Sequence, residues 1–136
     1  MTVTFFKPTA LRMGLVLAAC AGLAACGSAA GMSQSNPDYF YTRIKDGQMT
    51  GKYNPAGFKQ DEVRKLLQSN CQGKALASYG EQAADGLMVF SATCKGGFVN
   101  ARAGIEYERA GSTVVAEMLG ADSNGNIVTN RSDIAL

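Results

Sequence analysis

The chain has 136 residues, a formal net charge of +2 at pH 7 and no histidine. Its length is that of one domain. Lys7 and Arg12 precede an apolar N-terminal stretch, and without them eleven cations balance eleven anions. A neutral domain has no overall field that attracts nucleic acid, and the lack of histidine excludes His-dependent catalytic triads and the usual zinc sites.

The N-terminus has the three zones of a secretory signal peptide. Residues 1–13 carry both cations and no acid, residues 14–25 are small and apolar, and Cys26 opens a small polar run. A membrane-spanning helix needs ~20 apolar residues, and this stretch is shorter. The sequence therefore predicts that residues 1–25 are a signal peptide.

The phrase Leu-Ala-Ala-Cys occurs twice, ending at Cys20 and at Cys26. It resembles the lipobox of bacterial lipoproteins, in which the cysteine receives a diacylglyceryl group and a peptidase cuts before it. Signal cores run ~7–15 residues, which favours Cys26 over Cys20. The resemblance implies a lipid anchor on Cys26 and, because Gly27 rather than Asp follows, the periplasmic face of an outer membrane. The alternative is ordinary cleavage, which gives a soluble periplasmic protein.

Residues 26–38 are predicted to be the lipidated cysteine and a flexible tether, because the run is small, polar and without periodicity. A domain over 39–136 follows. The turn signal Asp46-Gly47 predicts a hairpin from strands at 39–45 and 48–53.

That first hairpin is rich in tyrosine, with Tyr39, Tyr41 and Tyr53 close to the tether. Tyrosine is favoured at protein interfaces, so these three residues are candidates for binding a partner. The alternative is that they belong to the core and its rim.

Two cysteines remain after the signal peptide, and an oxidising compartment favours their pairing. Residues 61–71 have a helical apolar face that ends at Cys71, and residues 87–94 alternate as a strand whose apolar face ends at Cys94. These patterns predict a Cys71–Cys94 disulfide that ties a helix to a sheet.

The remaining segments are mostly extended. Strands are expected at 74–82, 98–109 and 127–129, whereas 112–121 is compatible with a strand or a helix, the strand being favoured. The predicted fold class is therefore α+β: a single helix packed on an antiparallel β-sheet, with one disulfide.

Two fragments invite a catalytic or metal-binding interpretation. Glu106 and Glu108 share a strand face ~7 Å apart, a spacing that suits acid/base chemistry on a glycan, but a solvated strand face is commoner. Residues Asp122, Asn124, Asn126 and Asp133 follow calcium-loop spacing. Ile127 stands where that loop needs glycine, and a hairpin turn explains the same residues. We expect no cofactor and no metal.

The sequence thus favours a non-enzymatic binding or scaffolding module of the cell envelope. It would bind the membrane through its N-terminal lipid and would bind an envelope protein, but no nucleic acid. One alternative is an inhibitor of a cell-wall hydrolase, which needs a protruding loop such as 82–86 or 122–126. A less favoured alternative is a glycan-acting enzyme that uses carboxylates alone.

Overall fold

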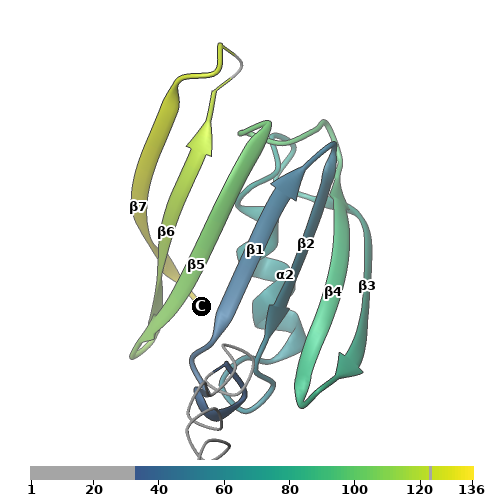
Figure 1. Ribbon diagram of the computed structural model, residues 1–136, viewed down its shortest axis with the longest axis vertical. Coiled ribbons are helices and arrows are strands. Elements are labelled where there is room, and N and C mark those ends of the chain that lie inside the picture. The colour runs from purple at the N-terminus through teal and green to yellow at the C-terminus, as the bar shows by residue number, and fades with distance from the viewer. Residues whose placement is uncertain (1–32, 123) are drawn as a thin grey trace, which may run out of the picture.

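An antiparallel sheet of seven strands dominates the residues that the structure describes (Figure 1). The computed structural model describes residues 33–122 and 124–136. The strands are β1 Phe40–Lys45, β2 Gln48–Tyr53, β3 Leu76–Ala84, β4 Leu87–Cys94, β5 Arg102–Ala110, β6 Thr113–Ala121 and β7 Ile127–Ala135. They lie in the order β3-β4-β2-β1-β5-β6-β7, so β1 and β5 are neighbours although helix α2 (Gln60–Gln68), β3 and β4 separate them in the chain.

The expectation of a single helix packed on an antiparallel sheet is wrong. The described residues are mostly sheet, and besides α2 they contain a second, short helical segment at 33–35. This segment lies in the run predicted as a tether, which has no apolar periodicity to indicate a helix. Tertiary contacts hold it: the side-chain amide of Asn54 donates to the carbonyls of Gln34 and Asn36, at 3.0 and 2.9 Å. Contact with the domain therefore begins before residue 39.

Helix α2 lies behind the middle of the sheet in Figure 1 and covers one of its faces. Its apolar side consists of Val63, Leu66 and Leu67, all fully buried, as the helical spacing predicted. The Glu62 carboxylate accepts a hydrogen bond from the backbone N–H of Lys59 at 2.9 Å and so marks the start of the helix. The helix ends before Cys71, which pairs with Phe98 in an isolated bridge.

The core between α2 and the sheet is a cluster of aromatic rings. Phe40 stacks on Tyr107 with ring centroids 4.4 Å apart, and it meets Phe58 and Phe90 edge-on at 5.2 and 5.9 Å. Each such ring buries a large apolar area, and aromatic pairs add to the stabilisation. The stacked pair joins β1, which carries Phe40, to β5, which carries Tyr107, although the two strands are distant in sequence. This contact favours the position of β1 beside β5.

The predicted disulfide between Cys71 and Cys94 is confirmed. Their Cα atoms lie 5.3 Å apart, and the bond connects the turn after α2 to the last residue of β4. Cys71 is almost completely buried, at 1% exposure. The bond therefore links the two layers of the domain.

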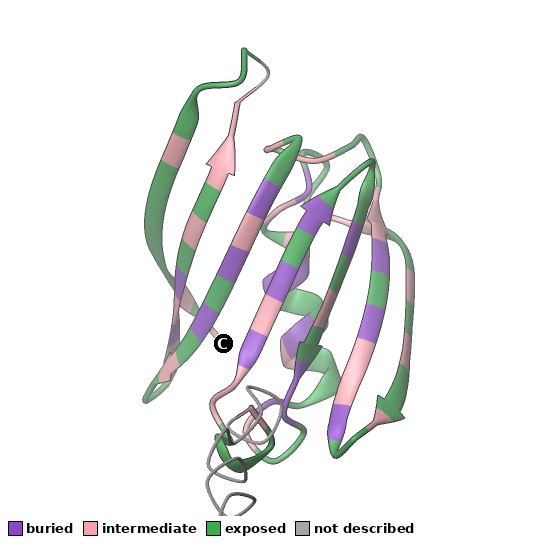
Figure 2. Ribbon diagram, in the orientation of Figure 1, coloured by how far each residue is buried: buried purple, intermediate pink, exposed green. Residues whose placement is uncertain are grey.

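The two faces of the sheet differ in burial. Along β5, Ala103, Ile105 and Tyr107 are buried toward α2, whereas Glu106 and Glu108 are exposed on the other side, as predicted. Figure 2 shows this alternation along β1 and β5, and it shows β7 largely exposed. We call the α2 side the covered face. The opposite side, which carries the side chains that alternate with the core residues, is the open face.

Candidate partner-binding face

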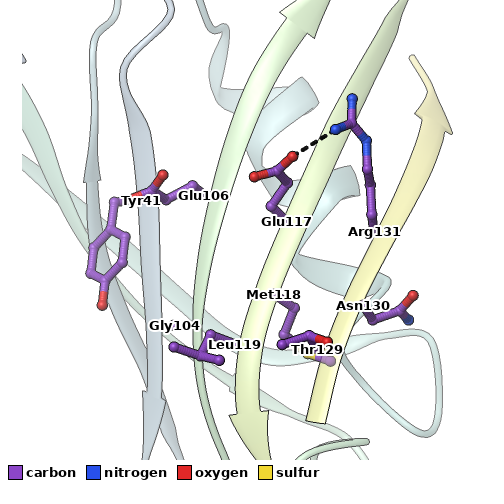
Figure 3. A pocket seen from close by; sticks show the side chains of 9 residues that line it. All are labelled: Tyr41, Gly104, Glu106, Glu117, Met118, Leu119, Thr129, Asn130 and Arg131. Atoms are coloured by element: carbon purple, nitrogen blue, oxygen red, sulfur yellow. Dashed lines mark hydrogen bonds and ion pairs between the residues drawn. The ribbon is translucent and has the colours of Figure 1, made fainter.

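A row of polar side chains crosses four strands on the open face. The strand register places Tyr41 of β1 opposite Glu106 of β5, Glu106 opposite Glu117 of β6, and Glu117 opposite Arg131 of β7. Figure 3 shows these four side chains from close by. Each lies on its strand where the alternating pattern turns the side chain away from the core.

A shallow depression of about 650 Å³ lies along this row. Gly104 forms part of its floor, and the Tyr41 ring lies beside that glycine. A Cβ atom added at Gly104 would lie 3.0 Å from the Tyr41 hydroxyl oxygen. The missing side chain therefore lets the Tyr41 ring lie close to the sheet, and Leu119 and Thr129 line the depression from β6 and β7.

Anions gather at the end of the open face where β1 begins. A second depression of about 370 Å³ is lined there by Asp38, Glu106, Glu108 and Glu117, together with Tyr39 and Tyr41 among others. No lysine or arginine lines it. We call this region the acidic end.

Cations gather at the other end of the same face. Arg43, Lys45 and Arg102 line a third depression of about 470 Å³, which no carboxylate lines. Two apolar side chains border it, Leu119 at 61% exposure and Ile127 at 80%. We call this region the basic end. Most carboxylates of the open face thus lie toward one end of the strands and three cations toward the other, while Lys52 and Arg131 stand in the middle row with Tyr41 and Glu117.

Like charges stand opposite each other in the middle of the row. Glu106 faces Glu117 across β5 and β6, an arrangement that disfavours the sheet. Arg131 compensates Glu117 by donating from Nη1 to Oε1 at 2.8 Å. Within residues 33–122 and 124–136, no hydrogen bond or ion pair engages the Glu106 carboxylate. Glu106 is therefore an exposed anion that a ligand can approach.

The structure brings together two of the three tyrosines predicted to bind a partner. Tyr39 and Tyr41 are half-buried and line the acidic end. Tyr53 is separated from them, because it pairs with Phe40 and is buried in the core at 2% exposure. The two-residue turn at Asp46-Gly47 already implies this pairing, so the sequence contained the signal that places Tyr53 on the covered face.

Tyr53 belongs instead to a polar cluster at the β3 side of the core. The Glu81 carboxylate accepts hydrogen bonds from the hydroxyls of Tyr53, at 2.7 Å, and Tyr79, and from the amide of Gln60 at 2.9 Å. Burial, followed by the bonds to Glu81, raises the pKa of both tyrosines well above its usual value. Both hydroxyls therefore stay protonated and donate. The cluster attaches α2 to an edge strand, and no sequence pattern indicated it.

The four residues with calcium-loop spacing are not brought together. The Asp122 carboxylate accepts from the backbone N–H groups of Asn124 and Asn126, and Asp133 lies far along β7, opposite Val115. The hydrogen bond from the Asn126 side chain lowers the pKa of Asp122. In the described part of the chain, no three His, Cys, Asp or Glu side chains are placed to hold a metal ion. The turn accounts for Asp122, Asn124 and Asn126, whereas Asp133 belongs to β7.

The predicted signal peptide (1–25) and Cys26 lie outside the described residues. Among the residues described, no helix is long and apolar enough to cross a membrane. No protein-family model, curated protein or solved structure matches the chain.

Proposed function

We propose that the protein is a lipoprotein of the bacterial envelope and a non-enzymatic binding or scaffolding module that works through its open face. One observation supports this more than any other. The described residues cover one face of the sheet with α2, while the other face bears Tyr41, an unengaged Glu106 and exposed Leu119. Aromatic and apolar side chains among separated charges are typical of a recognition surface.

The proposed anchor is a diacylglyceryl group on Cys26, which the lipobox resemblance supports. Two acyl chains give stable membrane binding, whereas one is marginal. Only seven residues separate Cys26 from Gln34, whose carbonyl is bound by Asn54. Even fully extended, such a segment reaches only ~28 Å. The domain would therefore stay close to the periplasmic face of the outer membrane.

Mass spectrometry of the mature N-terminus tests the anchor. We expect a chain that begins at a lipid-modified Cys26 and fractionates with outer membranes, and a Cys26→Ala variant that loses the lipid. Gly27→Asp should move the protein to the inner membrane, by the same resemblance. An unmodified N-terminus at any later residue would refute the anchor and favour a soluble periplasmic protein.

Crosslinking in intact cells tests the binding role. A complex formed through the open face should be lost in the Tyr39→Ala/Tyr41→Ala variant. It should persist in the control Lys65→Ala, which alters an exposed side chain of α2. An unchanged complex in the tyrosine variant would contradict the proposal.

Two further outcomes would replace the proposal. Capture of a cell-wall hydrolase, lost on changing the loop at 82–86 or 122–126, would favour the inhibitor alternative. Turnover of a cell-wall glycan that disappears in Glu106→Gln would show an enzyme instead.

A further inference from the structure

We propose that the open face binds a second copy of this chain, in a face-to-face dimer whose strands run antiparallel to those of the first copy. This inference rests on the proposed function, because it names the occupant of the same face. The supporting observation is the separation of charge into an acidic end and a basic end. Such a surface is complementary to itself after a half-turn.

Two pairs of complementary side chains are placed symmetrically about one row of the sheet. Thr42 pairs with Ile105, and Ile105 pairs with Met118, so these residues define a line across β1, β5 and β6. On β5, Arg102 and Glu108 lie three residues to either side of this line, and both are exposed. On β1, Tyr41 and Arg43 lie one residue to either side.

A two-fold axis along this line makes opposite groups meet. A half-turn about it lays each strand on the same strand of the second copy, in the opposite direction. Glu108 then faces Arg102 of the second copy, and Tyr41 faces Arg43 of the second copy. Because a two-fold contact is isologous, each pair occurs twice. The pairs are a salt bridge and a cation–aromatic contact.

The alternative two-fold axis, parallel to the strands, is unfavourable. It would place the acidic end of one copy on the acidic end of the other, and like charges at an interface cost several kcal/mol. The charge pattern therefore selects one orientation for the pair.

The size of the face and its apolar groups fit such a contact. Seven strands at ~4.8 Å spacing and ~20 Å of strand length give ~600 Å² per copy, at the lower bound for specific interfaces. The depression beside Gly104 lies across the axis, and on β6 Glu117 and Leu119 lie one residue to either side of it, so Leu119 of each copy would enter the depression of the other beside Glu117. Burying this exposed side chain adds apolar area to the charged pairs.

Charge reversal on β5 tests the dimer. The mature full chain, purified from membranes in detergent, is measured by sedimentation at low and high salt. We expect a dimer that weakens at high salt. Glu108→Arg and Arg102→Glu should each raise the dissociation constant at least ~10-fold, because each places like charges together twice. The double variant Glu108→Arg/Arg102→Glu should restore the dimer.

The restoration is diagnostic, because the two residues lie ~20 Å apart along one strand and cannot compensate each other within a copy. Lys65→Glu on α2 is the matched control and should leave the dimer unchanged. Unchanged urea midpoints would show that every variant is folded.

A monomeric wild type, or a double variant that stays monomeric when each single variant dissociates, would overturn the dimer. If a different envelope protein is then crosslinked in a Tyr41-dependent manner, the proposed binding role stands without the dimer. If no Tyr41-dependent complex forms either, both proposals fail.

Discussion

The two faces of the sheet are made by the same strands, yet they differ in what their side chains do. On β1, Phe40 and Ile44 are buried against the aromatic cluster, while Arg43 and Lys45, from the same six-residue strand, are exposed on the open face. Alternation by two produces both faces at once. Packing on the covered face supplies stability, whereas the charges on the open face lie outside the core.

The largest difference should follow from removing one aromatic ring from each face. Phe40→Ala opens a cavity in the core and should cost about 3–5 kcal/mol of unfolding free energy. Its neighbour Tyr41→Ala, on the open face, should cost about 1 kcal/mol or less. Urea unfolding of the two variants measures both values. Equal losses would contradict the assignment of stability to the covered face.

Loss of the disulfide should be the next largest effect. The bond joins two cysteines with a sequence separation of 23 and should contribute about 3 kcal/mol to the free energy of unfolding. We expect the Cys71→Ala/Cys94→Ala variant to unfold at correspondingly lower urea. Open-face binding measured under native conditions should survive, because neither cysteine lies on that face. Two free thiols in the wild-type protein purified without reductant would refute the pairing.

An arginine on each face sharpens the comparison. Arg109 donates to the carbonyl of Gly57 at 2.7 Å and to Glu62 at 2.9 Å, and its guanidinium lies 5.0 Å from the centre of the Phe58 ring. Its side chain is 25% exposed, whereas that of Arg131, paired with Glu117, is 69% exposed.

We therefore expect Arg109→Ala to cost about 1–3 kcal/mol, because a partly buried carbonyl and carboxylate lose their donor. Arg131→Ala should cost about 0–1 kcal/mol, as exposed ion pairs do. Urea midpoints at low and high salt separate the two. A larger loss for Arg131→Ala would reverse the comparison.

A further modest effect is a pH dependence that belongs to the covered face. Burial raises the pKa of Tyr107 to about 12, and the hydrogen bond from Asn70 opposes this only in part. The unfolded chain loses this proton near pH 10, so the stabilisation is complete below pH 10 and is lost as the pH rises toward 12.

At pH 11 the loss should be on the order of 1 kcal/mol. Urea unfolding between pH 9 and pH 11 measures it, with Tyr107→Phe as the comparison. The variant should lose less stability over this range than the wild type, although Tyr53 and Tyr79 still contribute. An identical decline in both proteins would show that Tyr107 does not carry the effect.

Local signals predicted the elements well where two of them agreed. The Asp46-Gly47 turn lies between β1 and β2 as expected, and β4 has the predicted bounds Leu87–Cys94. In both the β1–β2 hairpin and β4, alternating apolar residues are bounded by turn residues, so two signals indicated the same element. β7 extends to Ala135, well past the predicted end at residue 129, because pairing with β6 holds a polar stretch that has no apolar alternation of its own.

The candidate site was predicted only in part. Tyr39 and Tyr41 were predicted to bind a partner because the first hairpin is rich in tyrosine, and the structure places both on the open face. Tyr53, predicted on the same ground, lies in the core. Arg102 and Arg43 were not singled out at all. They line one depression only because β1 pairs with β5, across an insertion of helix and strands.

The sequence by itself determined the turns, the alternation that separates core from surface along each strand, and the choice of Cys71 and Cys94 as a pair. The turns and the alternation depend on residues that are close in the chain. The choice of the cysteine pair depends on setting aside Cys20 and Cys26, which the predicted signal peptide and lipid anchor account for. Tertiary structure alone decided the strand order, the helical segment at 33–35 that Asn54 binds, and the separation of charge on the open face. The physical reason is that such features arise from contacts between segments distant in the chain. The free energy of these contacts depends on the whole packed core, and no periodic pattern within a single segment indicates them.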